Sequence, residues 1–369
     1  MRLPRFSACS GSLAMTRDRW SSQTLLGTGI RDRRVTPKEA LKVPHDAVRL
    51  FPALICMLLV CFVGAAPLQA AKYAGDPFSL GVGARGLALG GAVVAGPFDG
   101  SAAYWNPAGM NYLDRRRLVG MHAETFGSLL NHDFIAYTDS RPRANSTVQA
   151  YSFYLYYLGG GGIKITQLNE FDRPFVLREE SHGDFLLTAA MAGKLSDRIG
   201  YGLSAKIIYR DIGTESGYGL TMDAGMLYQW RPSLRLGLMV TDITSGFIRY
   251  SGKTFDSGAN VESIYPTVKP GLMLKHSHRD FTGRLVASGD IKFESLQETA
   301  QYWTGSLSLD AHYGLELGWR EMVFGRAGYD IGRLTAGGGF SVKNIAVDFA
   351  YLHHSDLDAT FRLSAEYRW

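Results

Sequence analysis

The best-known chemical pattern in this sequence is glycine-rich. Gly81, Gly83 and Gly86 have the G-x-G-x-x-G spacing of a dinucleotide-binding loop. Such a loop holds a pyrophosphate only between a buried strand and a helix, with an acidic residue about twenty positions further on. The surrounding sequence has neither the strand-helix pattern nor that acidic residue. We therefore do not expect nucleotide binding here.

Side chains that could catalyse a reaction or ligate a metal are isolated along the chain. Ser204 lies in Gly-Leu-Ser-Ala-Lys, which lacks the second glycine of a nucleophile elbow, and no serine, histidine and acid set has a recognisable spacing. His353 and His354 with Asp356 could ligate a metal, but they fall in an expected strand-end loop, where polar residues are ordinary. The sequence therefore predicts no enzyme, no metal and no cofactor.

The first recognisable element along the chain is an apolar run at residues 50–66. Small residues follow it, so residues 48–70 are predicted to be a signal peptide cleaved after Ala70. The alternative is that the run stays uncleaved as an anchor. Residues 1–47 have scattered Arg, Pro and Ser without apolar periodicity, which predicts a disordered or mis-annotated N-terminal extension.

Charge and cysteine content limit the functions open to the mature part. Residues 71–369 carry 29 Lys and Arg against 30 Asp and Glu, and no cysteine. This balance excludes the basic surface that nucleic-acid binding requires, and the missing thiols exclude disulfide chemistry. The one basic triplet, Arg115-Arg116-Arg117, would either line a membrane interface or form a site for phospholipid or substrate.

No apolar run after residue 70 approaches the roughly 18 to 20 residues of a membrane-spanning helix, so any membrane contact would be made by strands. Side chains do alternate between apolar and polar, as in Leu220 and Met222 against Thr221 and Asp223. The same period of two recurs in 313–320, where leucines alternate with Glu316. Such strands fit a barrel with lipid outside and a polar lumen, or alternatively a soluble periplasmic β-protein.

Counting back from the C-terminus gives short and long connections in alternation, as in a membrane barrel. The sequence therefore predicts an all-β fold, a 14-stranded antiparallel transmembrane β-barrel formed by residues 113–369. The expected strands are 117–127, 132–140, 147–157, 183–195, 199–213, 216–230, 233–243, 265–277, 282–293, 309–320, 322–330, 333–343, 345–355 and 359–369.

Residues 158–182 are expected to form an external loop that starts at a run of four glycines, Gly159, Gly160, Gly161 and Gly162. One interpretation of the run is a flexible tight turn, because glycine adopts positive φ without steric cost. The other is a kink that opens the barrel wall sideways.

The chain ends on an amphipathic strand in which Phe361, Leu363, Tyr367 and Trp369 share one face. This pattern resembles the C-terminal assembly signal of bacterial outer-membrane barrels. It implies the barrel-assembly machinery and outer-membrane lipid as partners, and a location in the bacterial outer membrane.

Residues 71–112 are rich in Gly and Ala and lack strand alternation, so we expect a hatch, or plug, in the lumen rather than wall. Within it, Pro107 should push Asn106 towards an extended conformation, and the Asn106 amide could bond backbone groups that a buried irregular segment leaves unpaired. With Trp105, Ala108 and Gly109, these residues either hold the hatch together or form the moving part of a gate.

Two stretches, FSLGVGARGLALGGA at 78–92 and AAYWNPAG at 102–109, resemble the N-terminal region of the PorV/PorQ family within the FadL-like outer-membrane group. The Asn106-Pro107-Ala108 triplet is similar to a motif in the hatch of long-chain fatty-acid transporters. The resemblance implies a 14-stranded barrel with a luminal N-terminal segment, and passive binding or transport of a hydrophobic small-molecule ligand. The alternative that it implies is a type IX secretion accessory barrel, which binds secreted proteins or secretion components and transports nothing.

Overall fold

The computed structural model describes residues 76–125, 129–141, 146–213, 215–244, 246–251, 261–293, 300–353 and 359–369. The expected N-terminal extension (1–47) and signal peptide (48–70) lie outside the described residues, as do His354 and Asp356. None of the helices in the described ranges is long and apolar enough to cross a membrane.

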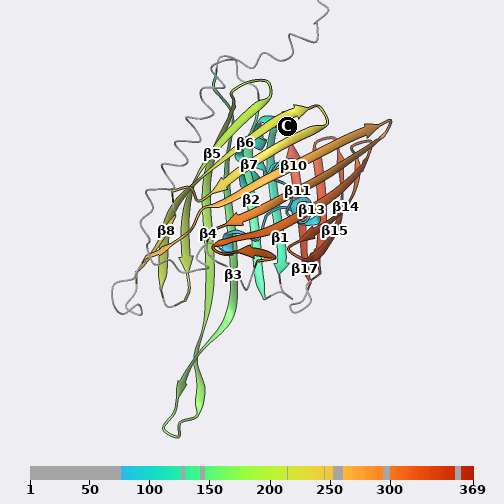
Figure 1. Ribbon diagram of the computed structural model, residues 1–369. Coiled ribbons are helices and arrows are strands. Elements are labelled where there is room, and N and C mark those ends of the chain that lie inside the picture. Colours follow the sequence, from blue (N-terminus) through green and yellow to red (C-terminus); the bar gives the residue numbers. More distant parts are fainter. Residues whose placement is uncertain are drawn as a thin grey trace, which may run out of the picture. The chain divides into compact units, whose positions relative to one another are not determined.

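The wall is one antiparallel sheet that closes on itself, because the first and last strands pair from Arg117 with Arg368 to Glu124 with Phe361 (Figure 1). The prediction of a closed 14-stranded antiparallel barrel is confirmed by its long strands. These are β1 (Arg116–Thr125), β2 (Leu130–Asp139), β3 (Val148–Leu168), β4 (Pro174–Lys194), β5 (Ile199–Asp211), β6 (Ser216–Arg231), β7 (Leu234–Thr241), β10 (Thr267–His278), β11 (Phe281–Lys292), β13 (Leu307–Trp319), β14 (Val323–Asp330), β15 (Arg333–Val342), β16 (Ile345–Leu352) and β17 (Thr360–Arg368).

The longest connections lie at one end of the barrel, as expected, but the alternation in length is incomplete, because residues 331–332 form a short turn at that same end. Short turns such as 232–233 and 343–344 lie at the barrel end that also holds the C-terminus, which we call the turn end. The long connections 242–266 and 293–306 lie at the opposite end, the loop end. Three short strands in these long connections were not predicted: β8 (Phe247–Tyr250), β9 (Val261–Ser263) and β12 (Tyr302–Thr304).

The expected external loop at 158–182 is wrong, because most of it is strand. Beyond Gly160, β3 pairs only with β4, and the two form a hairpin that projects past the neighbouring strands (Figure 1). The four glycines lie within β3, where the pairing register shifts between Gly160 and Ile163 and Gly162 has a φ of +78°. The glycine run is therefore neither a loop nor a turn but contains a bulge, which an antiparallel pair accommodates by locally twisting.

Apolar and polar side chains lie on opposite faces of the strands, as the sequence predicted. On β6, Leu220 is 52% exposed and Thr221 is fully buried. On β13, Leu315 and Leu317 are exposed on either side of a fully buried Glu316. The polar face therefore points into the barrel and the apolar face points outward.

The residues before the wall form short helices: η2 (Asp76–Phe78), α2 (Ala84–Ala88), α3 (Ala102–Trp105) and η3 (Pro107–Tyr112). We call residues 76–113 the inner segment, since they pack against inward-facing side chains of the wall. Its Val82 and Met110 are fully buried in one apolar cluster with Phe134 and Tyr156 of the wall. The hydrophobic core thus lies between the inner segment and the barrel.

Candidate functional site

The glycines of the G-x-G-x-x-G pattern make room for an indole ring. Trp105 donates from Nε1 to the carbonyl oxygen of Val82 over 3.1 Å, which brings the two halves of the inner segment together. A Cβ on Gly86 would lie 2.5 Å from the Trp105 ring, and one on Gly81 would lie 2.8 Å from it. Gly83, with a φ of +77°, precedes α2 as its N-cap. The spacing therefore serves close packing around Trp105.

Asn106 satisfies backbone groups from two parts of the chain. Asn106 is fully buried, and its backbone is extended, with φ −167° and ψ 110°. The expected effect of the following proline is therefore confirmed. The side-chain Nδ2 donates to the carbonyl oxygen of Val94 over 2.9 Å, and Oδ1 accepts from the amide of Ala108 over 3.0 Å. Longer bonds from Nδ2 reach Met226 and Leu238 in the wall.

The wall offers the Asn106 corner a matching recess. Gly202 and Gly225 are register partners on β5 and β6. A Cβ on Gly225 would overlap Asn106 Oδ1, and a Cβ on Gly202 would overlap the backbone between Pro107 and Ala108. The inner segment can therefore approach the wall only because neither glycine has a side chain.

The remaining predicted hatch residues lie in the same contact. Ala108 is fully buried at the start of η3, and a Cβ on Gly109 would lie 2.6 Å from the Phe98 ring. Asn111, which sequence reasoning missed, donates from Nδ2 to the carbonyl oxygen of Gly193 in the wall over 2.8 Å. The pattern Asn-Pro-x-x-x-Asn would have been its only sequence signal.

A buried carboxylate ties α2 to strand β13 of the wall. Glu316 of β13 accepts from Arg85 at 2.8 and 2.9 Å, and it also accepts from Arg284 and Arg326 at 2.6 Å each. Its inward direction was expected. A Glu316→Lys replacement would place an ammonium among three guanidinium groups without a counter-charge, so we expect it to be poorly tolerated.

The inward face of β17 provides further attachments for the inner segment. Arg362 donates to the carbonyl oxygens of Gly81 at 3.0 Å and Leu80 at 3.3 Å. Ser364 accepts from the amide of Ala84 at 2.7 Å, and Glu366 accepts from the amide of Gly100. These contacts with the inner segment were not predicted from the sequence. The polar residues that alternate with the apolar face of the strand were the feature that could have indicated them.

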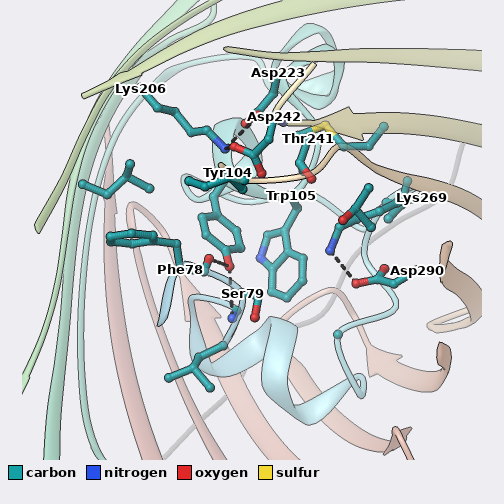
Figure 2. Close-up of a pocket in the computed structure, with 18 of the residues that line it drawn as sticks. Phe78, Ser79, Tyr104, Trp105, Lys206, Asp223, Thr241, Asp242, Lys269 and Asp290 are labelled. Carbon is teal, nitrogen blue, oxygen red and sulfur yellow. Dashed lines mark hydrogen bonds and ion pairs between the residues drawn. The ribbon is translucent and has the colours of Figure 1, made fainter. Parts of the chain in front are cut away.

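A cavity of about 130 Å³ lies on the loop-end side of the inner segment. Figure 2 shows Phe78, Tyr104 and Trp105 on one side of it, facing charged side chains from the wall strands. Burial raises the pKa of Tyr104, and its hydroxyl donates to the carbonyl oxygen of Phe78 over 2.7 Å. We call this the loop-end cavity; its inner-segment side is aromatic and neutral.

The charged side of the loop-end cavity is internally paired. Lys206 lies 2.7 Å from Asp223 and 2.8 Å from Asp242, and Lys269 lies 2.5 Å from Asp290 (Figure 2). Tyr154, Leu186, Ile208 and Ile264 complete the lining with apolar surface. The cavity therefore combines an apolar wall with ion pairs whose charges already compensate one another.

A second cavity, of about 350 Å³, lies on the other side of the inner segment and reaches the turn end. Pro97, Phe98 and Tyr112 of the inner segment line it, together with basic side chains from the wall. The inner segment thus contributes to the linings of both cavities and lies between them. We call this second one the turn-end cavity.

The other residues singled out from the sequence lie apart from these cavities, except one. Arg117 faces the turn-end cavity and bonds Glu366 at 2.9 Å, whereas Arg116 pairs with Asp139 at 3.4 Å, so the basic triplet is divided between the two faces of β1. The aromatic C-terminal residues point outward from β17, and the Tyr367 and Trp369 rings stack with centroids 5.4 Å apart.

The residues considered for catalysis or metal binding make ordinary side-chain contacts. Ser204 Oγ donates to Asp223 over 3.2 Å, and the exposed His353 lies 3.5 Å from the Tyr351 hydroxyl. Among the residues that the structure describes, no group of three or more His, Cys, Asp or Glu side chains is placed to hold a metal.

Comparison with known proteins gives a fold. No family model matches this chain, and no curated protein matches it. Several solved structures are similar. Among them are the CymD monoaromatic hydrocarbon channel, with a TM-score of 0.51, 12% identity and coverage of 79% of this chain and 98% of that one, and the Ralstonia pickettii toluene transporter TbuX, with a TM-score of 0.50, 13% identity and coverage of 78% and 98%. At these identities the similarity establishes the shared barrel architecture.

Proposed function

We propose that this chain is an outer-membrane barrel that admits hydrophobic small molecules passively, and that the inner segment is its hatch. The fold supports the proposal, since two of the similar structures are described as a monoaromatic hydrocarbon channel and a toluene transporter. The exposed apolar face of the strands suits a lipid environment, as on Leu315 and Leu317.

The observation that carries the proposal is the pair of cavities on the two sides of the inner segment. The loop-end cavity presents Phe78, Tyr104 and Trp105 to an entering ligand, and the turn-end cavity begins behind Phe98 and Tyr112. A path along the barrel therefore needs only a rearrangement of the inner segment. An aromatic and apolar lining with a few polar groups is typical of small-molecule sites.

The mechanism needs no energy source, because a ligand moves down its own gradient. It would enter between the long loop-end connections and pack on the aromatic side of the loop-end cavity. Release to the turn end would require the Asn106 corner to leave its recess beside Gly225, or the Arg85–Glu316 contact to open. The inner segment would then close again on the same glycines.

Planar-bilayer conductance and toluene uptake by cells test the proposal together. Deleting residues 74–110 should leave a folded barrel with increased conductance, and Asn106→Ala should give a smaller increase and a change in toluene uptake. Gly120→Ala is the matched control, because a Cβ there would have nothing within 4 Å. A truncated barrel that folds but conducts no more than the full chain would remove the hatch from the proposal.

The resemblance of the inner segment to the PorV/PorQ family favours a second candidate function, that of a type IX secretion accessory barrel. Under that role, neither the full chain nor Asn106→Ala would take up toluene, and secretion components would co-purify with the protein. The uptake measurement therefore separates the two functions directly.

A further inference from the structure

The turn-end cavity has more basic than acidic side chains. Seven Arg and Lys side chains line it against four Asp and Glu. In the loop-end cavity Lys206, Lys269 and Lys292 line the space with four aspartates, one of which pairs with His312, so the two signs nearly balance there. The turn-end cavity is therefore the more favourable of the two places for an anion.

Most of the turn-end arginines already share carboxylates. Glu316 accepts from three of them, and Glu366 lies 2.9 Å from Arg117 and 3.4 Å from Arg368. Arg235 and Lys275 are the exceptions: within the described ranges, neither forms an ion pair. The excess positive charge is thus located on these two side chains.

Arg235 is held in a fixed orientation. Its guanidinium lies over the Tyr112 ring, 3.6 Å from the ring centroid; Nε donates to Gln229 Oε1 over 2.9 Å, and Nη1 donates to the carbonyl oxygen of Ala95 over 3.5 Å. The remaining N–H groups at the edge of the guanidinium plane can donate hydrogen bonds to an oxyanion. The position is therefore suited to a carboxylate or phosphate group.

Lys275 approaches the same cavity from the neighbouring strand. Arg235 of β7 is the register partner of Met273 of β10, two residues before Lys275, so the two basic residues lie at the same barrel end. Phe98, Tyr112 and Met273 line the cavity beside them. The arrangement combines two unpaired cations with an apolar surface.

We propose that the turn-end cavity binds an anionic amphiphile, with its carboxylate or phosphate oxygens on Arg235 and Lys275 and its apolar body against Phe98, Tyr112 and Met273. This site does not depend on transport, since it lies on the far side of the inner segment from the loop-end cavity. It would hold either a free carboxylate compound or the phosphate group of a membrane lipid.

Isothermal titration calorimetry on the full chain in a neutral detergent tests the site with three probes: decanoate, decyl phosphate and decanol. Decanoate or decyl phosphate should bind more tightly than decanol. Lys275→Gln and Arg235→Gln should each weaken binding of the anion about 10-fold, the loss of one charge-assisted contact. Arg235→Lys, which keeps the charge but not the planar guanidinium, should fall between wild type and Arg235→Gln.

Lys194→Gln is the control, because it removes an exposed lysine near the same barrel end that does not line the cavity. Heat-modifiable migration on gels confirms that each variant is folded. Tighter binding of decanoate identifies a carboxylate ligand, and tighter binding of decyl phosphate identifies a lipid. Equal binding of all three probes, or equal loss in Lys194→Gln and Lys275→Gln, would overturn the proposal, whatever the outcome of the uptake experiments.

Discussion

Gly202 of β5 faces Gly225 of β6 as its register partner, and the Asn106 corner of the inner segment occupies the recess that this pair leaves in the wall. Two glycines side by side weaken a sheet locally, because each removes a cross-strand side-chain contact. Here the loss is compensated by burial of a fully enclosed asparagine and its hydrogen bonds. The recess and the corner are therefore one structural unit, although Gly202 and Gly225 lie 96 and 119 residues after Asn106 in the chain.

Gly225→Ala should displace the inner segment from the wall while leaving the barrel closed. The added methyl group overlaps Asn106 Oδ1, and overpacking of this kind costs about 1–3 kcal/mol. Limited proteolysis should then cut within residues 76–113 faster than in wild type, and single-channel recordings should show flickering openings. Gly120→Ala, whose methyl group meets open space, should behave as wild type in both measurements.

Glu316→Gln should destabilise the protein more than removal of an exposed carboxylate. It would leave three guanidinium groups without their shared counter-charge, and breaking such a buried pair costs about 3–5 kcal/mol. Urea unfolding in detergent micelles measures the change. The control is Glu179→Gln in the exposed hairpin, and similar unfolding midpoints for the two variants would contradict the prediction.

Leu315→Lys should impair insertion because Leu315 belongs to the outward apolar face. A lysine near the middle of a bilayer costs about 2–4 kcal/mol on the lipid face of a barrel. Folding yield into liposomes checks this, with Phe171→Lys as control, since Phe171 is 79% exposed at the tip of the hairpin beyond the wall. Normal folding of Leu315→Lys would argue against lipid contact at this face.

Deleting Trp369 should reduce assembly into the outer membrane. Its ring stacks on Tyr367 and packs against Tyr137, at the strand pair where the barrel closes. Heat-modifiable migration of the membrane fraction reports assembly, and Trp303→Ala at the loop end is the comparison. If the shortened chain assembles at the wild-type level, the C-terminal residue is not an assembly signal.

The strands could be predicted because alternation is a local property. A buried Glu316 between exposed leucines is visible within three residues of sequence, and the same pattern located all fourteen long strands of the wall. The hairpin at 158–182 was missed because four glycines interrupt the alternation, so that a bulged strand and a loop have the same composition there. The short strands β8, β9 and β12 have too few residues to show any period.

The site could be predicted only where its cause was local. The extended conformation of Asn106 follows from the proline after it, and it was foreseen. The recess at Gly202 and Gly225, and the Arg85–Glu316 contact, depend on which distant residues the closed barrel brings together. No spacing within one stretch of sequence encodes those pairings.

The inner segment has almost no regular structure that could persist alone. Its α-helices contain five and four residues, far below the roughly 12 to 15 at which an isolated helix becomes even marginally stable in water. Several of its hydrogen bonds instead join it to late strands of the wall, 231 positions away for Arg85 with Glu316 and 281 positions away for Gly81 with Arg362. The inner segment precedes the wall in the chain, yet its contacts with β13 and β17 can form only once those strands are in place. We therefore expect the wall strands to enclose the leading segment before that segment takes its final conformation.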